Sequence, residues 1–162
     1  VSGDEQKLET ETLKMLGDYT NGQIEWLDSL VSATCTRVPV IDGHMVTVSV
    51  SLDTKPSLDE VIAAWESYRG YEPVATLPSA PQPPLEYHTQ IDRPQSRRDR
   101  NAGNGMATSI GRLRECPILG YKFAALSHNT IRGAAGCSIL NAELMAVEGY
   151  IPNFAPLEVA HA

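Results

Sequence analysis

"MVTVSVSL", residues 45–52, alternates apolar and polar side chains along its whole length. A period of two residues is typical of a β-strand with one buried face, because successive side chains of a strand point to opposite sides. The expected buried face consists of Val46, Val48, Val50 and Leu52. The Asp42-Gly43 pair just before this strand has the composition of a two-residue hairpin turn. We therefore expect residues 31–41, which are rich in Val, Thr and Ile, to form the partner strand of a hairpin.

Helical and extended patterns alternate along the rest of the chain. Capping residues, apolar stripes and apolar runs predict helices at residues 4–16, 56–69 and 132–147 and strands at residues 107–113 and 119–127. Residues 71–106 contain six prolines and predict a long segment that is either a functional or interface loop or partly mobile. This order of elements predicts an α+β fold, with a mostly antiparallel sheet covered by helices.

The composition is acidic, with a net charge of -7 and a pI near 5.0. Nucleic acids and anionic membranes recruit basic surfaces, so neither is expected as a partner. No stretch has the roughly 20 continuous apolar residues of a membrane-spanning helix. The three cysteines are irregularly spaced and favour neither a disulfide framework nor a zinc site. No metal is expected, and a reducing, cytoplasmic setting fits best.

The segment RVPVIDGH, residues 37–44, holds an arginine and a histidine that the expected hairpin would place on one face of the sheet. An arginine fork binds a carboxylate through two hydrogen bonds, and a histidine gives or takes a proton near neutral pH. Together they suit a small acid whose other end undergoes proton-coupled chemistry. In the alternative interpretation, His44 fills the apolar face that it shares with Val46, and Arg37 pairs with a stray carboxylate. The spacing does not decide between the two.

The first predicted helix carries Lys7, with Asp4 one turn before it and Glu11 one turn after it. This arrangement could hold an ammonium group for an anion, and it could equally support the helix. The cysteines lie in no obvious activating context, so each is first of all an ordinary thiol. A rival hypothesis is a cysteine-histidine enzyme that uses His44 with one of the following: Cys35, Cys116 or Cys137.

Four motifs follow one another along the chain: DEQKLETETLKML, TCTRVPVIDGH, NGMATSIGRLR and HNTIRGAA. In this order they resemble the carboxy-terminal half of aspartate-semialdehyde dehydrogenase, of the branch shared by fungi and archaea. The resemblance spans nearly all of the chain. It implies a catalytic domain of the type found in the carboxy-terminal part of glyceraldehyde-3-phosphate dehydrogenase, in agreement with the α+β pattern.

The resemblance also implies an activity and the residues that serve it. Family members convert aspartyl phosphate to aspartate semialdehyde and phosphate with NADPH, on the route to lysine, threonine and methionine. By this resemblance, Arg37 binds the substrate carboxylate and His44 is the acid/base catalyst. Lys7 would contribute to the phosphate and substrate pocket. The family's substrate-contacting carboxylate falls on Asp4, with Glu5 beside it, and either could serve.

The family's nucleophilic cysteine and its Gly-rich cofactor loop belong to an amino-terminal half that this chain does not include. NADP would be bound mainly by that half, with Asn129 near the nicotinamide. Residues 1–128 would be a catalytic and dimerisation domain, and residues 129–162 a terminal helix segment that packs on the cofactor-binding domain. A homodimer or homotetramer is expected, with the amino-terminal half as a further partner. The alternative is a non-catalytic oligomerisation module, inactive without that half.

Overall fold

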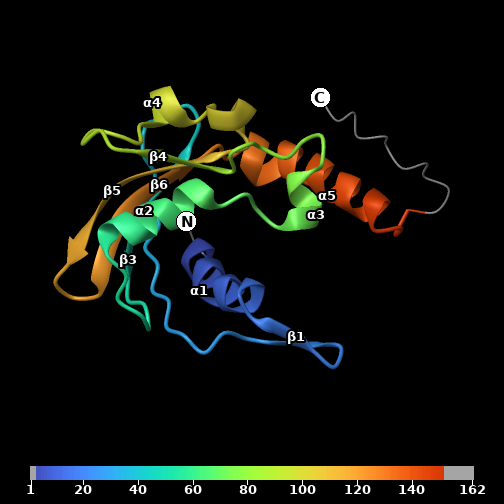
Figure 1. The fold of residues 1–162 in the computed structure, drawn as a ribbon, viewed down its shortest axis with the longest axis horizontal. Helices are drawn as coiled ribbons and strands as arrows, with labels where there is room; N and C mark the ends of the chain where they lie inside the picture. Colours follow the sequence, from blue (N-terminus) through green and yellow to red (C-terminus); the bar gives the residue numbers. More distant parts are fainter. Residues whose placement is uncertain (1–2, 152–162) are drawn as a thin grey trace. The chain divides into compact units, whose positions relative to one another are not determined.

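A computed structural model describes residues 3–151 of the 162-residue chain (Figure 1). The chain divides into two compact units, Val1–Pro39 and Val40–Ala162, and each is described here by itself. Part of the expected terminal segment 129–162 lies outside the described residues, since the structure does not describe residues 152–162.

The first unit contains helix α1 (Asp4–Met15) and a small hairpin of β1 (Asp18–Thr20) and β2 (Gln23–Glu25). The two strands pair antiparallel, with Thr20 opposite Gln23. The turn residues Asn21 and Gly22 both have positive φ, at 52° and 81°, which is the backbone that a two-residue hairpin turn requires. The helix predicted at residues 4–16 is confirmed.

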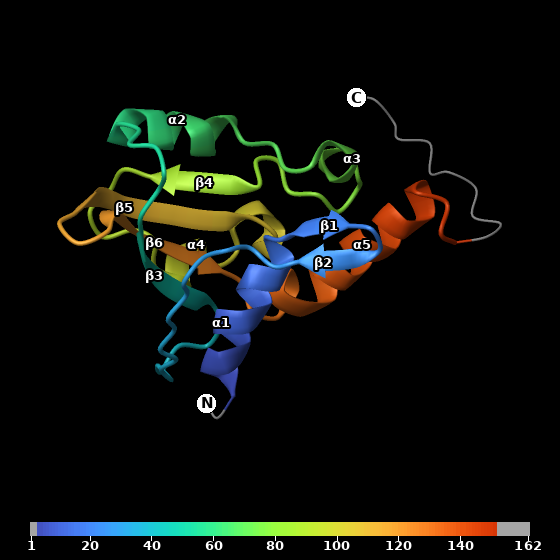
Figure 2. The ribbon, with the colours of Figure 1, turned by 90° about the horizontal axis from the view of Figure 1, so that it is seen from below.

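The second unit is built on a four-stranded sheet in the order β3-β6-β5-β4. Its strands are β3 (His44–Val50), β4 (Leu85–His88), β5 (Thr108–Cys116) and β6 (Gly120–Ser127). Figure 2 shows them side by side. The β3–β6 and β5–β6 pairs are antiparallel, whereas β4 and β5 are parallel. The predicted α+β fold with a mostly antiparallel sheet is therefore confirmed.

Helices cover this sheet and extend beyond its end. They are α2 (Leu58–Ser67), α3 (Glu72–Ala75), α4 (Ser96–Asp99) and α5 (Gly136–Val147). Helix α2 lies beside β4 (Figure 2). The Trp65 ring of this helix contacts the rings of Tyr87, in a tilted arrangement, and Phe123, edge to face, with ring centroids 5.8 and 5.1 Å away. A second cluster joins α3 to α5 through buried Leu77, Met106 and Leu140. Among residues 3–151, no helix has the length and apolar content needed to cross a bilayer.

The predicted hairpin around Asp42-Gly43 is wrong. Residues 31–41 contain no strand, and β3 pairs along its whole length with β6, which places Val48 opposite Phe123. Pro39 has no N–H for a ladder, while β6 offers Phe123 and Ala125 to the apolar face of β3. The partner of β3 is thus a distant strand and not the neighbouring segment, and the predicted buried face is only partly covered, since Val46 and Leu52 are 49% and 42% exposed.

The predicted long loop at residues 71–106 is also wrong in part. This segment contains the short helices α3 and α4, the strand β4 and a 3-10 turn at Ala102–Gly105. Its prolines did not prevent β4 from forming, because the strand begins directly after Pro84 and lies at the edge of the sheet. The last helix begins with a π-helical turn, Ile131–Ala135, before α5.

Candidate active site

His44 is the first residue of β3 and is exposed. It lies directly opposite Ser127, the last residue of β6, so the two side chains share a face of the sheet. The Ser127 hydroxyl in turn lies 3.3 Å from the hydroxyl of Thr108 on β5. The alternative in which His44 fills an apolar face is therefore wrong, because His44 is exposed at the end of its strand.

The residue before His44 is fixed from two sides. Gly43 is buried, has a φ of 106°, and donates its backbone N–H to the side-chain oxygen Oδ1 of Asn129 at 2.8 Å. A Cβ added to Gly43 would lie 3.0 Å from Cδ1 of Leu126 and 3.4 Å from Cβ of Ser96 on α4. Both the backbone angle and the close approach therefore require glycine at this position.

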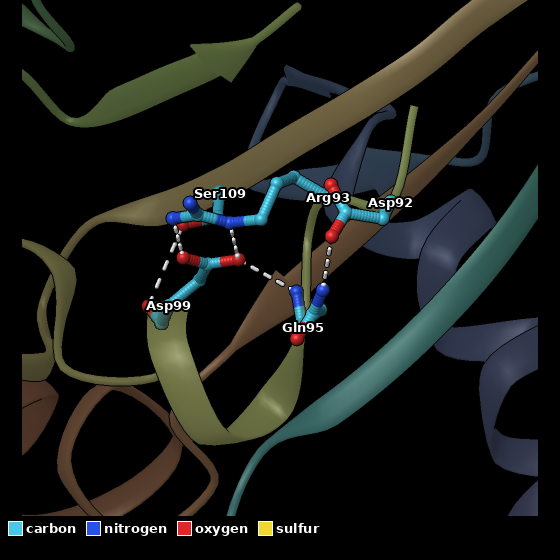
Figure 3. Close-up of polar contacts among 5 residues, drawn as sticks. All are labelled: Asp92, Arg93, Gln95, Asp99 and Ser109. Carbon is cyan, nitrogen blue, oxygen red and sulfur yellow. Dashed lines mark hydrogen bonds and ion pairs between the residues drawn. The ribbon is translucent and has the colours of Figure 1, made fainter. Parts of the chain in front are cut away.

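Helix α4 is anchored by an ion pair that we call the Arg93–Asp99 clamp (Figure 3). Arg93 donates from Nε to Oδ2 of Asp99 at 2.7 Å and from Nη2 to Oδ1, so the contact is bidentate. Oδ2 of Asp99 also accepts the backbone N–H of Gln95 at 2.6 Å, and Asp99 is only 4% exposed. The side chain of Ser109, which is fully buried on β5, donates to the backbone oxygen of Asp99 at 3.5 Å. The clamp thus ties α4 to the sheet beside Gly43.

Burial and the hydrogen bonds of Asp99 shift the pKa of its carboxyl in opposite directions. Burial alone raises the pKa of this carboxyl, but the hydrogen bonds from Arg93 and from the Gln95 amide outweigh it and hold the pKa below its ordinary value. The ionised form is therefore the stabilising one. Its contribution to stability is fully present above the unfolded-state pKa near about 3.9, and it is lost as the pH falls through the lower, folded-state pKa.

Asp99→Asn should lower the melting temperature of the chain at neutral pH by roughly 5–10 °C, because it leaves the half-buried Arg93 guanidinium without its carboxylate. The difference from the wild-type chain should narrow below about pH 3.9, because there the unfolded wild-type chain binds a proton at this carboxyl more readily than the folded chain does. Thermal unfolding followed by circular dichroism from about pH 7 to about pH 3 measures both effects. Asp92→Asn is the matched control, since exposed Asp92 accepts a bond from the Gln95 side chain at 2.8 Å. A constant difference across this pH range would contradict the assignment.

In the first unit, the side chain of Arg37 donates from Nη2 to Oδ2 of Asp4 at 3.1 Å. Both side chains are exposed, at 73% and 47%. Arg37 thus contacts a carboxylate of its own unit, and this exposed contact does not decide whether Arg37 also binds a substrate. Exposed pairs of this kind stabilise by only about 0–1 kcal/mol, so a carboxylate in solution can compete for the guanidinium at little cost.

The other predicted residues of α1 have different partners. Lys7 lies 4.0 Å from Oε1 of Glu11, with both side chains mostly exposed, as the helical spacing predicts. Oε1 of Glu5 accepts the backbone N–H of Cys35 at 2.8 Å, so this carboxylate holds the segment that leads to Arg37. Asp4, Lys7 and Arg37 belong to the first unit, and His44 and Asn129 to the second. The hairpin register that placed Arg37 and His44 on one face does not exist.

The three cysteines are free and partly buried. Hydrogen bonds from the backbone amides of Leu119 and Ile118 lower the pKa of Cys116. Cys116 nevertheless pairs with Gly120 at one end of β6, whereas His44 pairs with Ser127 at the other end, about 23 Å away at the usual strand rise. A direct Cys116–His44 pair is therefore excluded. Among residues 3–151, no group of three or more His, Cys, Asp or Glu side chains could hold a metal ion.

Comparison with known proteins identifies the family. A model of the semialdehyde dehydrogenase dimerisation domain matches residues 1–132. The aspartate-semialdehyde dehydrogenase of Archaeoglobus fulgidus is 48% identical over 151 residues, which are 93% of this chain and 43% of that protein. The enzyme of Aspergillus fumigatus is 44% identical over 160 residues, with 93% and 44% covered. The chain thus spans less than half the length of these relatives.

Solved structures agree with the sequence relatives. The crystal structure of aspartate-semialdehyde dehydrogenase with NADP from Candida albicans is 39% identical, has a TM-score of 0.83, and matches 93% of this chain and 44% of that one. The predicted resemblance to the fungal and archaeal branch is confirmed. Since the family model covers most of its length, this chain belongs to the semialdehyde dehydrogenase family, by its dimerisation domain.

Proposed function

We propose that this chain is the catalytic and dimerisation part of an NADP-dependent aspartate-semialdehyde dehydrogenase. The enzyme would reduce aspartyl phosphate to aspartate semialdehyde with release of phosphate, on the route to lysine, threonine and methionine. The names of its relatives support the reaction. The observation that carries the proposal is the exposed guanidinium of Arg37, which already holds a carboxylate at 3.1 Å.

Arg37 would bind the substrate carboxylate in place of, or beside, the carboxylate of Asp4. An exposed ion pair exchanges partners readily, and a guanidinium fork grips a carboxylate through two parallel hydrogen bonds. Lys7 would add a second cation for the phosphate, since its ammonium group is exposed and only loosely paired, at 4.0 Å from Glu11.

Of the two candidate carboxylates, we assign the substrate contact to Asp4. Glu5 is committed to the backbone of Cys35, while Asp4 is half-exposed and already beside Arg37. Asp4 would accept from the substrate ammonium group and at the same time orient the guanidinium. This assignment separates two adjacent carboxylates that the sequence alone left equivalent.

His44 would move the protons. Attack by a thiol of the amino-terminal half on the acyl phosphate requires a base to take the thiol proton, and release of the aldehyde returns a proton to that sulfur. An exposed imidazole at a fixed strand end suits both steps, because it can reach a substrate while its backbone stays in place.

NADPH, when bound, would supply the hydride. In this chain Asn129 is the residue proposed to lie near it. Its Oδ1 atom is engaged by the Gly43 amide, which turns the amide nitrogen away from Gly43 and leaves it as a donor for a ligand. This donor chemistry fits a carboxamide or ribose contact, while most of the binding would come from the amino-terminal half.

The remaining parts of the proposal concern assembly. Residues 1–128 would provide the catalytic and dimerisation domain and residues 129–162 the segment that meets the cofactor-binding domain. The family match to a dimerisation domain supports a homodimer or homotetramer. The three free cysteines support a cytoplasmic setting.

An oligomerisation module without catalytic function is the second candidate. The dimerisation-domain match and the exposed apolar residues of β3, Met45 at 45% and Val46 at 49%, favour it for the chain taken alone. Association of the isolated chain without any binding of substrate would support this module.

One assay tests the proposed function. A full-length enzyme that carries this chain should oxidise NADPH when aspartyl phosphate is supplied. The loss of NADPH absorbance measures this oxidation. The isolated chain should show no turnover. The reason is that a histidine without its nucleophile and hydride source cannot complete the reaction. Turnover by the isolated chain, or a full-length enzyme inactive with aspartyl phosphate, would contradict the proposal.

A further inference from the structure

We propose that Asn129 is a positioning residue for His44, which acts by holding the backbone amide of Gly43. This inference rests on the proposed function, in which His44 moves protons. It gives Asn129 a task that is separate from any contact with the cofactor.

The contact joins two segments 86 residues apart. Asn129 follows the end of β6 by two residues, and Gly43 precedes the start of β3 by one, so the bond closes the sheet end at which His44 lies. Because the Gly43 N–H is a donor, the side-chain atom that faces it at 2.8 Å must be the oxygen of the amide. The bond thus extends the β3–β6 ladder by one step, with a side-chain oxygen in place of a backbone one.

Gly43 has little other freedom. It is buried, and its Cα is close to Leu126 on β6 and to Ser96 on α4, as the contacts of an added Cβ show. Helix α4 is in turn held by the Arg93–Asp99 clamp. Packing therefore restricts Gly43 from one direction and Asn129 fixes its amide from another. Together, the packing and the hydrogen bond fix the backbone that precedes His44 and so the position from which its side chain extends.

Asn129 is itself held in place. The preceding residue, His128, is 5% exposed, and its Nδ1 atom accepts the backbone N–H groups of Thr130 and Ile131, each at 3.3 Å. The N–H of Gly133 donates to the backbone oxygen of His128 at 2.9 Å. These bonds fix the backbone on both sides of Asn129, so its side chain is a firm anchor for Gly43.

A loss of this anchor should affect proton transfer more than binding. When the Gly43 N–H loses its acceptor, the backbone before His44 gains conformational freedom. The imidazole is then no longer held at one position. A displacement of about 1 Å from a reactive geometry costs on the order of 100-fold in rate. The effect should fall on kcat, since His44 contributes to the reaction step.

The test compares variants of the full-length enzyme. Asn129→Ala should lower kcat at saturating NADPH roughly 10- to 100-fold, a loss that a weaker cofactor contact alone would not cause. Asn129→Asp keeps an oxygen acceptor for Gly43 but removes the amide donor, so it should recover most of the lost kcat. In a His44→Asn background, Asn129→Ala should cause little further loss, because the two residues act on one step. Asn141→Ala, the same change at an exposed position of α5, is the matched control.

Each alternative predicts a different pattern. If Asn129 served only the cofactor, Asn129→Asp and Asn129→Ala would both raise the KM for NADPH and leave kcat at saturation intact, which would overturn the inference. The inference would also be overturned if Asn129→Ala lowered kcat in the His44→Asn background by the same factor as in the wild-type enzyme. If His44→Asn itself kept normal turnover, the proposed role of His44 would fail and the inference with it. If Asn129→Ala does not fold, Asn129→Leu, which also lacks the oxygen acceptor but keeps the side-chain volume, takes its place, and an unchanged kcat at saturating NADPH in that variant would overturn the inference.

Discussion

His44→Asn in the full-length enzyme should lower kcat with aspartyl phosphate by roughly 100- to 10,000-fold, while the KM for that substrate changes little. Asparagine has a similar shape and polarity but cannot exchange a proton at neutral pH. His44 is exposed and lies at a strand end, so the substitution removes no core packing and should leave the fold intact.

Initial rates over a range of aspartyl phosphate concentrations separate the two parameters. Thr47→Ala is the control, since it changes an exposed side chain of the same strand that points to the opposite face of the sheet. An increase in KM with unchanged kcat would assign His44 to substrate binding. The proton-transfer role would then have to be carried by another group.

Elements whose ends depend on neighbouring residues could be predicted from the sequence. Helix α2 is an example, because Ser57 accepts the Glu60 N–H at 3.3 Å and the Glu60 carboxylate accepts the Ser57 N–H at 2.7 Å. Both partners lie within one turn, so the capping pattern can be read directly from the chain. The alternation of residues 45–52 likewise identified β3, although not its partner.

Elements that depend on distant residues could not be predicted in the same way. The partner of β3 is β6, which is far away in the sequence, and the local Asp-Gly signal pointed to the wrong segment. A real two-residue hairpin turn lies at Asn21-Gly22, where both residues have positive φ. At Asp42-Gly43 only the glycine does. The dipeptide permits a hairpin, but its flanking strands must also have a reason to pair.

The candidate site shows the same division. The spacing on α1 identified Lys7 and Glu11 as neighbours, and the motifs drew attention to Arg37, His44 and Asn129. The Arg93–Asp99 clamp was missed, because the basic run SRRDR at residues 96–100 gave no sign that its one carboxylate would be buried. The bond between Asn129 and Gly43 was missed because it joins the ends of two strands that meet only in the folded sheet. Long-range geometry, and not residue type, determined both.

The pairing of Arg37 with Asp4 determines what a substitution there would reveal. The bond is made by a single guanidinium nitrogen at 3.1 Å between exposed side chains, so its loss should hardly affect stability. A bound substrate carboxylate would instead accept two charge-assisted hydrogen bonds in a less hydrated setting. The same side chain can therefore be unimportant for folding and important for turnover.

Arg37→Ala in the full-length enzyme should accordingly reduce kcat/KM for aspartyl phosphate by roughly 100- to 1,000-fold, or about 3–4 kcal/mol, with little change in melting temperature. Arg37→Lys keeps the charge but loses the fork, so it should fall between the wild-type enzyme and Arg37→Ala. Steady-state kinetics and thermal unfolding on the same samples provide both quantities. Arg69→Ala is the matched control, because it removes an exposed arginine at the end of α2. An unchanged kcat/KM in Arg37→Ala would remove Arg37 from the substrate site. A large loss of stability would instead show that its pairing with Asp4 serves the fold.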